Sequence, residues 1–228
     1  MIFDLFGTLV PNNRDEPYHE SVRQMARLLG ADAERFLAVW TGEELTAKRF
    51  TGAFASQGDC IRHVLGVMGA SATEEAIVRA AEVRAQYTRD LLTPRPGAIE
   101  TVREVRRRGG KTALMTACST DTPAAFQATA MAGLFDATLF SSVEGLTKPD
   151  GRFYALARER LGVQAGECLY VGDGAGRELP GALAAGMTPV LLCDPSERDI
   201  VLVRPGVCDW PGLRIEAVPE VLGILDGR

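Results

Sequence analysis

Short apolar runs alternate with stretches of helical periodicity along most of this sequence. The runs that have the length of buried strands cover residues 1–3, 112–115, 137–140, 168–171 and 189–193, and 213–215 is a further candidate. Helical patterns lie between them at 99–108, 122–132, 151–161 and 178–185. Strands and helices in repeated order predict a parallel sheet with helices on both faces. The expected fold class is therefore α/β, with a doubly wound parallel sheet.

The region from about Pro11 to Leu92 follows a different pattern. It has only helical periodicity, as at 20–29, 33–43 and 74–91, and breaks that contain Gly or Ser separate the pieces. The chain leaves the expected sheet after its first strand and returns near the sequence TPRPG at 93–97, whose two prolines suit a stiff linker. We expect a helical cap domain, residues 14–92, inserted into a core domain made of residues 1–13 and 93–228.

Composition excludes several classes of protein. The 228 residues include 25 basic and 30 acidic side chains, a net charge of −5, which makes a poor surface for nucleic acid. No run approaches the roughly 18 apolar residues that a membrane span needs, and no basic segment of a signal peptide follows Met1. The five cysteines have no C-x-x-C spacing, which argues against a disulfide scaffold or a zinc site. We expect a cytoplasmic protein that binds neither nucleic acid nor a membrane.

Polar residues follow several of the apolar runs directly or after one glycine. Asp4, Thr116 and Asp173 stand at the ends of three expected strands, and Lys148 precedes an expected helix. Chemistry in such sheets collects at the carboxyl ends of the strands. A carboxylate there can attack a phosphoryl or alkyl centre and form a covalent intermediate. The backbone N–H groups after Thr116, beginning with Ala117, could bind an anion.

Four segments, taken in order, resemble the motifs of the haloacid dehalogenase (HAD) superfamily. They are FDLFGTL at 3–9, ALMT at 113–116, TKPDGRF at 147–153 and YVGDG at 170–174, followed by GALAAGM at 181–187. The resemblance covers nearly the whole chain. It includes the cap inserted after the first motif, as in the subfamily with an α-helical cap, and it implies a Rossmann-like core.

The resemblance implies a role for each matching residue. Asp4 would be the nucleophile, Thr116 would hydrogen-bond the transferred group, and Lys148 would neutralise Asp4 and that group. Asp173 would hold Mg²⁺ together with Asp4 and the backbone carbonyl of Phe6. The chemistry of these residue types agrees, because two close carboxylates repel each other unless a cation lies between them. Oxygen ligands also favour Mg²⁺.

Phe6 departs from the pattern of the phosphatases in this superfamily. Those enzymes usually carry a second Asp two residues after the nucleophile, where it serves as general acid and base. A phenylalanine cannot transfer a proton, and general acid–base assistance typically contributes about 10² to 10⁴-fold. Hydrolysis of ordinary alkyl phosphates should therefore be crippled, unless another group or a good leaving group compensates.

An aromatic residue at this position also resembles the 2-haloacid dehalogenases, which have Tyr there and expel a halide without a proton. Those enzymes do not depend on a metal, whereas Asp173 and Glu178 look placed for one, with Glu178 orienting a metal-bound water. They also tend to carry an aromatic residue and an Arg for the halide, and here Trp40 is followed by Thr41. The sequence thus favours Mg²⁺-dependent phosphoryl transfer on a small phosphorylated metabolite, with a dehalogenase as the alternative.

A third interpretation is a degenerate family member that binds a phosphorylated ligand or a protein without turnover. Phe6 supports it, and the intact set of motif residues opposes it.

Two basic residues of the expected cap are candidate substrate contacts. In helical-cap relatives, basic residues in the region of Lys48 and Arg49 can reach the substrate, although a solvated helix face is the other interpretation. Trp40 and Phe50 are expected in the cap core, and Asn12 in a polar hinge. The expected partner is a small anionic substrate.

Overall fold

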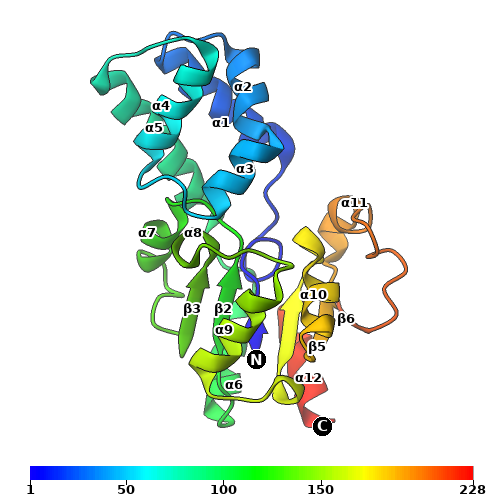
Figure 1. Cartoon of the computed structure of the whole chain (residues 1–228). Helices are drawn as coiled ribbons and strands as arrows, with labels where there is room; N and C mark the ends of the chain where they lie inside the picture. Colours follow the sequence, from blue (N-terminus) through cyan, green and yellow to red (C-terminus); the bar gives the residue numbers. More distant parts are fainter. Residues whose placement is uncertain (228) are drawn as a thin grey trace.

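The computed structural model describes residues 1–227 and contains one six-stranded sheet. All strand pairs are parallel, in the order β3-β2-β1-β4-β5-β6. The strands are β1 (Ile2–Phe3), β2 (Ala113–Thr116), β3 (Ala137–Phe140), β4 (Leu169–Gly172), β5 (Thr188–Leu192) and β6 (Leu213–Ile215). The expected doubly wound α/β fold is confirmed (Figure 1).

Helices cover both faces of the sheet because neighbouring strand residues point to opposite sides. Ile2 packs in one buried cluster with Phe153 and Leu179, whereas Phe3 packs in another with Val102. The core helices are α6 (Ala98–Arg107), α7 (Thr122–Gln127), α8 (Ser141–Glu144), α9 (Gly151–Leu161), α10 (Glu178–Ala184), α11 (Arg198–Val201) and α12 (Val221–Asp226). Short 3₁₀ turns lie at 165–167, 175–177, 195–197 and 218–220.

Five helices between β1 and α6 form a separate lobe above the carboxyl ends of the strands (Figure 1). They are α1 (Asp15–Leu28), α2 (Ala33–Thr41), α3 (Glu43–Phe50), α4 (Gln57–Met68) and α5 (Glu74–Leu91). Their apolar faces enclose a cluster of their own around Phe36, Trp40 and Ile61. This lobe is the inserted helical cap, and Trp40 lies in its core as expected. The boundaries 14 and 92 fall beside α1 and α5, and the division into a cap domain of residues 14–92 and a core domain of 1–13 and 93–228 stays a prediction.

Two expected helices are shorter in the structure. The pattern at 33–43 breaks at Gly42, which has extended backbone (ψ 143°) and separates α2 from α3. The pattern at 122–132 ends with α7 at Gln127. The Thr129 hydroxyl donates to the carbonyl of Phe126 and accepts from the N–H of Met131, and such local bonds compete with the helix. The helices α3 and α4 were not among the patterns singled out in the sequence.

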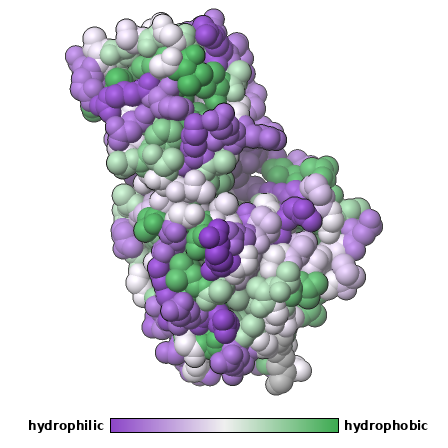
Figure 2. All heavy atoms as spheres, in the orientation of Figure 1, coloured by the Kyte–Doolittle hydropathy of each residue, from purple (hydrophilic) through white to green (hydrophobic). Residues whose placement is uncertain are grey.

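The outline of the molecule is indented where the cap lobe meets the part of the core that carries α11 (Figure 2). Residues of α3 and of the segment that follows α11 line one cavity there. Within residues 1–227, none of the helices is both long and apolar enough to span a bilayer. The compartment expected from the sequence stays a prediction.

Candidate active site

The central strand β1 delivers Asp4 to the middle of the sheet's carboxyl edge. Because β1 lies between β2 and β4, the ends of these three strands bring Asp4, Thr116 and Asp173 together. The backbone N–H of Asp4 donates to the carbonyl of Val171 at 2.9 Å, and the Asp4 side chain is almost fully buried. The strand ends therefore converge as the sequence predicted.

Lys148 lies between two buried carboxylates. Its Nζ is 2.8 Å from Asp4 Oδ1 and also contacts Glu178 Oε2. Burial alone would lower the pKa of Lys148, but Asp4 and Glu178 together raise it above its ordinary value. The lysine therefore stays charged. The pKa of Asp4 is raised by burial, opposed by Lys148, and raised further by the charge of Asp173.

Glu178, at the start of α10, is held from several sides. Its Oε1 accepts from the N–H of Gly174 at 2.8 Å, and its Oε2 accepts from the Tyr170 hydroxyl at 2.7 Å and from Lys148. Burial raises the pKa of Glu178 to about 8, and Lys148 acts in the opposite direction. Both oxygens are thus engaged by protein donors, and Glu178 positions Lys148. Its expected role toward a metal-bound water stays a prediction.

Asp173 is fully buried and forms a cluster with Asp4 and Glu178, whose ligand oxygens lie within 4.8 Å of one another. Asp173 Oδ1 accepts from the N–H of Ala175 at 3.1 Å, whereas Oδ2 has no hydrogen bond within residues 1–227. The backbone of Gly7 (φ 77°) passes so close that a Cβ there would lie 1.8 Å from Asp173 Oδ2. Only glycine fits this approach.

These oxygens fit a divalent cation. Asp4 and Asp173 are both buried, and their oxygens lie within 4.8 Å of each other. Asp4 Oδ1 forms an ion pair with Lys148, and Asp173 Oδ2 forms one with Arg204. Carboxylate oxygens are the hard donors that Mg²⁺ prefers. Repulsion between the two carboxylates gives a further reason for a cation to bind between them.

Arg204 was not anticipated from the sequence. It follows α11 in a segment without a motif, and its guanidinium contacts Asp173 Oδ2 and donates to the Asp173 carbonyl at 2.9 Å. Its Nη2 also donates to Asn12 Oδ1 at 2.7 Å, and the N–H of Asn12 donates to Glu197 at 2.9 Å. Asn12 is therefore buried and connects the first linker to this segment through hydrogen bonds. The position of Asn12 beside the first motif was the only sequence signal that pointed to these contacts.

One cavity of about 950 Å³ joins the motif residues. Asp4, Thr116, Lys148 and Ala117 line it from the core. The Thr116 hydroxyl is buried and has no hydrogen-bond partner within residues 1–227, so it is free to donate to a bound group. Phe6 also lines this cavity.

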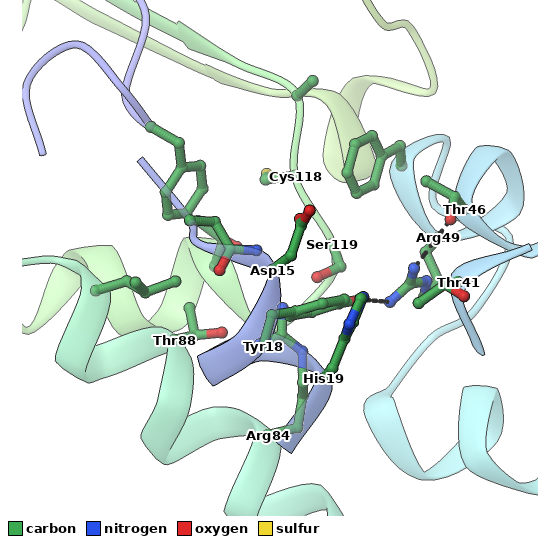
Figure 3. A pocket seen from close by; sticks show the side chains of 16 residues that line it. Asp15, Tyr18, His19, Thr41, Thr46, Arg49, Arg84, Thr88, Cys118 and Ser119 are labelled. Carbon is green, nitrogen blue, oxygen red and sulfur yellow. Dashed lines mark hydrogen bonds between the residues drawn. The ribbon is translucent and has the colours of Figure 1, made fainter. Parts of the chain in front are cut away.

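A second cavity, of about 400 Å³, lies between the cap and the core (Figure 3). Arg49 lines it together with Phe6, Ala117 and Phe50, which also line the cavity around Asp4. Phe50, expected in the cap core, instead lines both cavities. Lys48 lines neither, and its ammonium pairs with Glu44 at 2.7 Å on the surface of α3.

The parallel sheet, the strand-end carboxylates with their buried lysine, and the cap above them define a class of hydrolases whose chemistry is carried by carboxylate side chains. A family model described as haloacid dehalogenase-like hydrolase matches residues 1–186. The chain belongs to this family, as the four motifs indicated.

Two curated relatives are phosphatases. The chain is 36% identical over 99 residues to "Phosphatase MT3486" of Mycobacterium tuberculosis (strain CDC 1551 / Oshkosh), a match that covers 42% of this chain and 45% of that protein. It therefore spans less than half the length of this relative. This chain is also 26% identical over 206 residues to the ribulose-1,5-bisphosphate 5-phosphatase of Halopiger xanaduensis (strain DSM 18323 / JCM 14033 / SH-6). That match covers 87% of this chain and 85% of the relative.

Solved structures share the fold. A 2-haloacid dehalogenase from Pseudomonas syringae pv. Tomato DC3000 has a TM-score of 0.71 at 19% identity, over 99% of this chain and 97% of that chain. A HAD family enzyme from Bacteroides thetaiotaomicron, in complex with magnesium and inorganic phosphate, has a TM-score of 0.62 at 14% identity, over 84% and 92%. At these identities the likeness shows the fold alone.

Proposed function

We propose that this HAD-family hydrolase is a Mg²⁺-dependent phosphatase that transfers a phosphoryl group from a small phosphorylated metabolite to Asp4 and then to water. The observation that carries the proposal is the buried Asp4–Asp173 pair, whose ligand oxygens lie within 4.8 Å of each other at the carboxyl edge of the sheet. Two carboxylates held this close in a buried site favour a bound cation. The two phosphatase relatives support the same reaction class.

In the first step, an Asp4 carboxylate oxygen would attack phosphorus while the bond from phosphorus to the leaving oxygen breaks and its electron pair stays on that oxygen. The Lys148 ammonium favours the ionised form of Asp4 and would neutralise charge on the phosphoryl oxygens. The Thr116 hydroxyl and the Ala117 N–H would donate to the same oxygens. Mg²⁺, held by Asp4, Asp173 and the carbonyl of Phe6, would supply further charge neutralisation.

In the second step, water would attack the phosphorus of the aspartyl phosphate, which releases inorganic phosphate and restores the Asp4 carboxylate. Phe6 provides no proton to the departing alkoxide in the first step. Leaving groups that are weak bases, such as aryl or acyl phosphates, need little protonation and should be the better substrates.

A second candidate is a 2-haloacid dehalogenase. Two observations favour it: Phe6 is aromatic, and the Arg204 guanidinium already places a cation at Asp173 Oδ2. In that reaction Asp4 would displace a halide from carbon, which requires neither a metal nor a proton donor.

One set of assays separates these activities. We expect phosphate release from p-nitrophenyl phosphate or acetyl phosphate in Mg²⁺, its loss in EDTA, and its loss in Asp173→Asn. The control Asp199→Asn changes an exposed carboxylate of α11 and should keep activity. Fluoride release from fluoroacetate that persists in EDTA and in Asp173→Asn would establish the dehalogenase instead. No release in either assay would indicate a binding protein.

A further inference from the structure

Arg49 is a buried cation without a carboxylate partner. Its side chain lies in the cap, and the residue is only 4% exposed, yet no acidic group within residues 1–227 forms an ion pair with it. The guanidinium stacks over Trp40 at 4.7 Å and donates to the Trp40 carbonyl and to Thr46, each at 3.1 Å. Its Nε has no hydrogen-bond partner. Burying such a charge is costly unless an anion compensates it.

Arg84 of α5 reaches the same cavity from another side. It is 8% exposed, and its guanidinium lies 5.3 Å from the ring centres of both Tyr18 and Tyr87. Its one ion-pair partner within residues 1–227 is Asp121, at 3.9 Å from Nε. Neither Nε nor Nη1 of Arg84 has a hydrogen-bond partner. The carboxylate of Asp121 also accepts hydrogen bonds from the side chains of Gln57, Thr88 and Ser119.

Tyr18 lies between the two arginines (Figure 3). Its hydroxyl oxygen accepts from Trp40 Nε1 at 2.9 Å and from Arg49 Nη1 at 3.1 Å. Because a phenol can accept two hydrogen bonds and donate one, the Tyr18 proton is left to donate. Among residues 1–227, no acceptor for that proton is found. The cluster therefore has excess positive charge and excess donors, which is the chemistry of an anion site.

The cavity between these donors adjoins the one around Asp4, since Phe6, Ala117 and Phe50 line both. The other charged or titratable side chains at this cavity are the exposed Asp15, the half-buried His19 and the buried Cys118. A substrate whose phosphoryl group lies at Asp4 can thus extend past Phe6 toward the cap arginines.

We propose that Arg49 and Arg84, with the Tyr18 hydroxyl, bind a second anionic group of the substrate, remote from the phosphoryl group that Asp4 attacks. The substrate class is a small metabolite with two anionic ends, one a phosphate ester and the other a carboxylate or a second phosphate. This inference rests on the proposed phosphatase function for the first anion only.

Binding of phosphonates by isothermal titration calorimetry tests the proposal without turnover. The probes are propylphosphonate and 3-phosphonopropionate, which differ by a terminal methyl against a carboxylate, and their homologues longer by one to three methylene groups. Charge-assisted hydrogen bonds should make the carboxylated probe of the best length bind the wild-type protein in Mg²⁺ about 10 to 100-fold more tightly than its methyl partner.

Variants locate the effect. Arg49→Met and Arg84→Met should each remove most of that preference while the affinity for propylphosphonate changes little. Lys48→Met is the matched control, because it removes a cation from the neighbouring position of α3 that faces Glu44 and neither cavity. Arg49→Lys keeps the charge and should retain part of the preference. Thermal melts identify any variant that does not fold.

The comparison of probes in the wild-type protein is decisive even if both arginine variants unfold. Equal affinities at every length, or no binding of any probe, would overturn the proposal. A preference that survives in Arg49→Met and Arg84→Met, or that Lys48→Met removes equally, would overturn it as well. A clear preference in a protein that releases no phosphate from p-nitrophenyl phosphate would instead contradict the proposed function and leave the second anion site standing.

Discussion

The side chain of Phe6 limits which phosphate esters this site can cleave. It lies beside Asp4 in the motif and faces the cavity, but it has no proton to give. An alkoxide leaving group therefore lacks the assistance that the usual Asp provides. The rate should depend steeply on the basicity of the leaving group.

The first prediction concerns Phe6→Asp. It should raise hydrolysis of alkyl phosphates, such as sugar phosphates, by up to about 10², because a carboxyl group at this position can protonate the leaving oxygen. Activity on p-nitrophenyl phosphate should change much less. Initial rates of phosphate release on both substrates check this. Similar wild-type rates on alkyl and aryl esters would show that another group supplies the proton.

Gly7 allows a second prediction, with an internal control. In Gly7→Ala the new methyl group would overlap Asp173 Oδ2, in addition to the strain of a left-handed backbone. We expect a loss of roughly 2 to 5 kcal/mol in the free energy of unfolding and weakened Mg²⁺ binding. Gly30→Ala has the same type of backbone (φ 65°) but nothing within 4 Å, so it should cost about 1 kcal/mol and leave Mg²⁺ binding unchanged. Urea denaturation and metal titration give both values, and equal effects of the two substitutions would refute the overlap.

Single residues also show where sequence reasoning succeeds. Asp4, Thr116, Lys148 and Asp173 were predictable because each stands at a fixed place next to a strand or helix end, and the topology brings those ends together. Arg204 was not, because it reaches Asp173 from a segment without periodicity, through a contact across 31 positions of the chain. Such contacts depend on how an irregular segment folds back, which local patterns do not encode.

At the scale of elements, α5 and α4 of the cap are joined to the core through Asp121. Arg84 and Thr88 of α5 contact this carboxylate, and Gln57 of α4 donates to it at 2.7 Å. Burial alone would raise the pKa of Asp121, but Arg84 and the hydroxyl donors together hold it below its ordinary value. The ionised form therefore stabilises the attachment of the cap.

This pKa direction predicts a dependence on pH. The unfolded chain takes up the proton at a pKa of about 3.9, before the folded protein does. The stabilisation is therefore complete above that pH and is lost as the pH falls further, through the lower folded pKa. Asp121→Asn should destabilise the protein by about 3 kcal/mol near neutral pH and should reduce this acid sensitivity. Denaturation curves at several pH values measure both effects. Asp90→Asn, at an exposed site of α5, is the control, and an unchanged acid profile in Asp121→Asn would contradict the assignment.

The segment after α11 gives a prediction about the metal. Arg204 contacts Asp173, one of the oxygens that would hold Mg²⁺, and two cations compete for one carboxylate. In Arg204→Gln we expect Mg²⁺ to bind about tenfold more tightly in a calorimetric titration. The substitution Arg198→Gln, in α11 and paired with exposed Glu216, should have no effect. Weaker or unchanged binding in Arg204→Gln would mean that the guanidinium supports the site and does not compete for it.

The elements themselves were largely predictable. The ranges 137–140, 151–161 and 74–91 agree with β3, α9 and α5 to the residue, because buried strands and amphipathic helices carry strong periodicity. Of the missed helices, α3 has only eight residues, and α4 contains two glycines, Gly58 and Gly66, that weaken its helical pattern. Their packing around Trp40 stabilises them more than their own sequences do.

At the scale of the whole molecule, the two tryptophans report on different lobes. Trp40 is buried in the cap, and Trp210 packs with the core cluster that contains Tyr170. The cap and the core have separate apolar clusters, and the contacts around Asp121 between them are polar. We expect that a Trp210→Phe variant and a Trp40→Phe variant, followed by fluorescence in urea, unfold at different midpoints. Superimposable transitions would show that the two lobes unfold as one unit.

The position of β1 at the centre of the sheet has a consequence for biosynthesis. Its partners, β2 and β4, begin at Ala113 and Leu169, and all five cap helices lie between β1 and β2 in the chain. A ribosome therefore finishes the whole cap before β1 can pair with anything. At ordinary elongation rates, the nascent chain carries the nucleophile on an unpaired strand for on the order of 10 s. The carboxyl edge of the sheet, which carries Asp4, can form only after the cap that covers it has been synthesised.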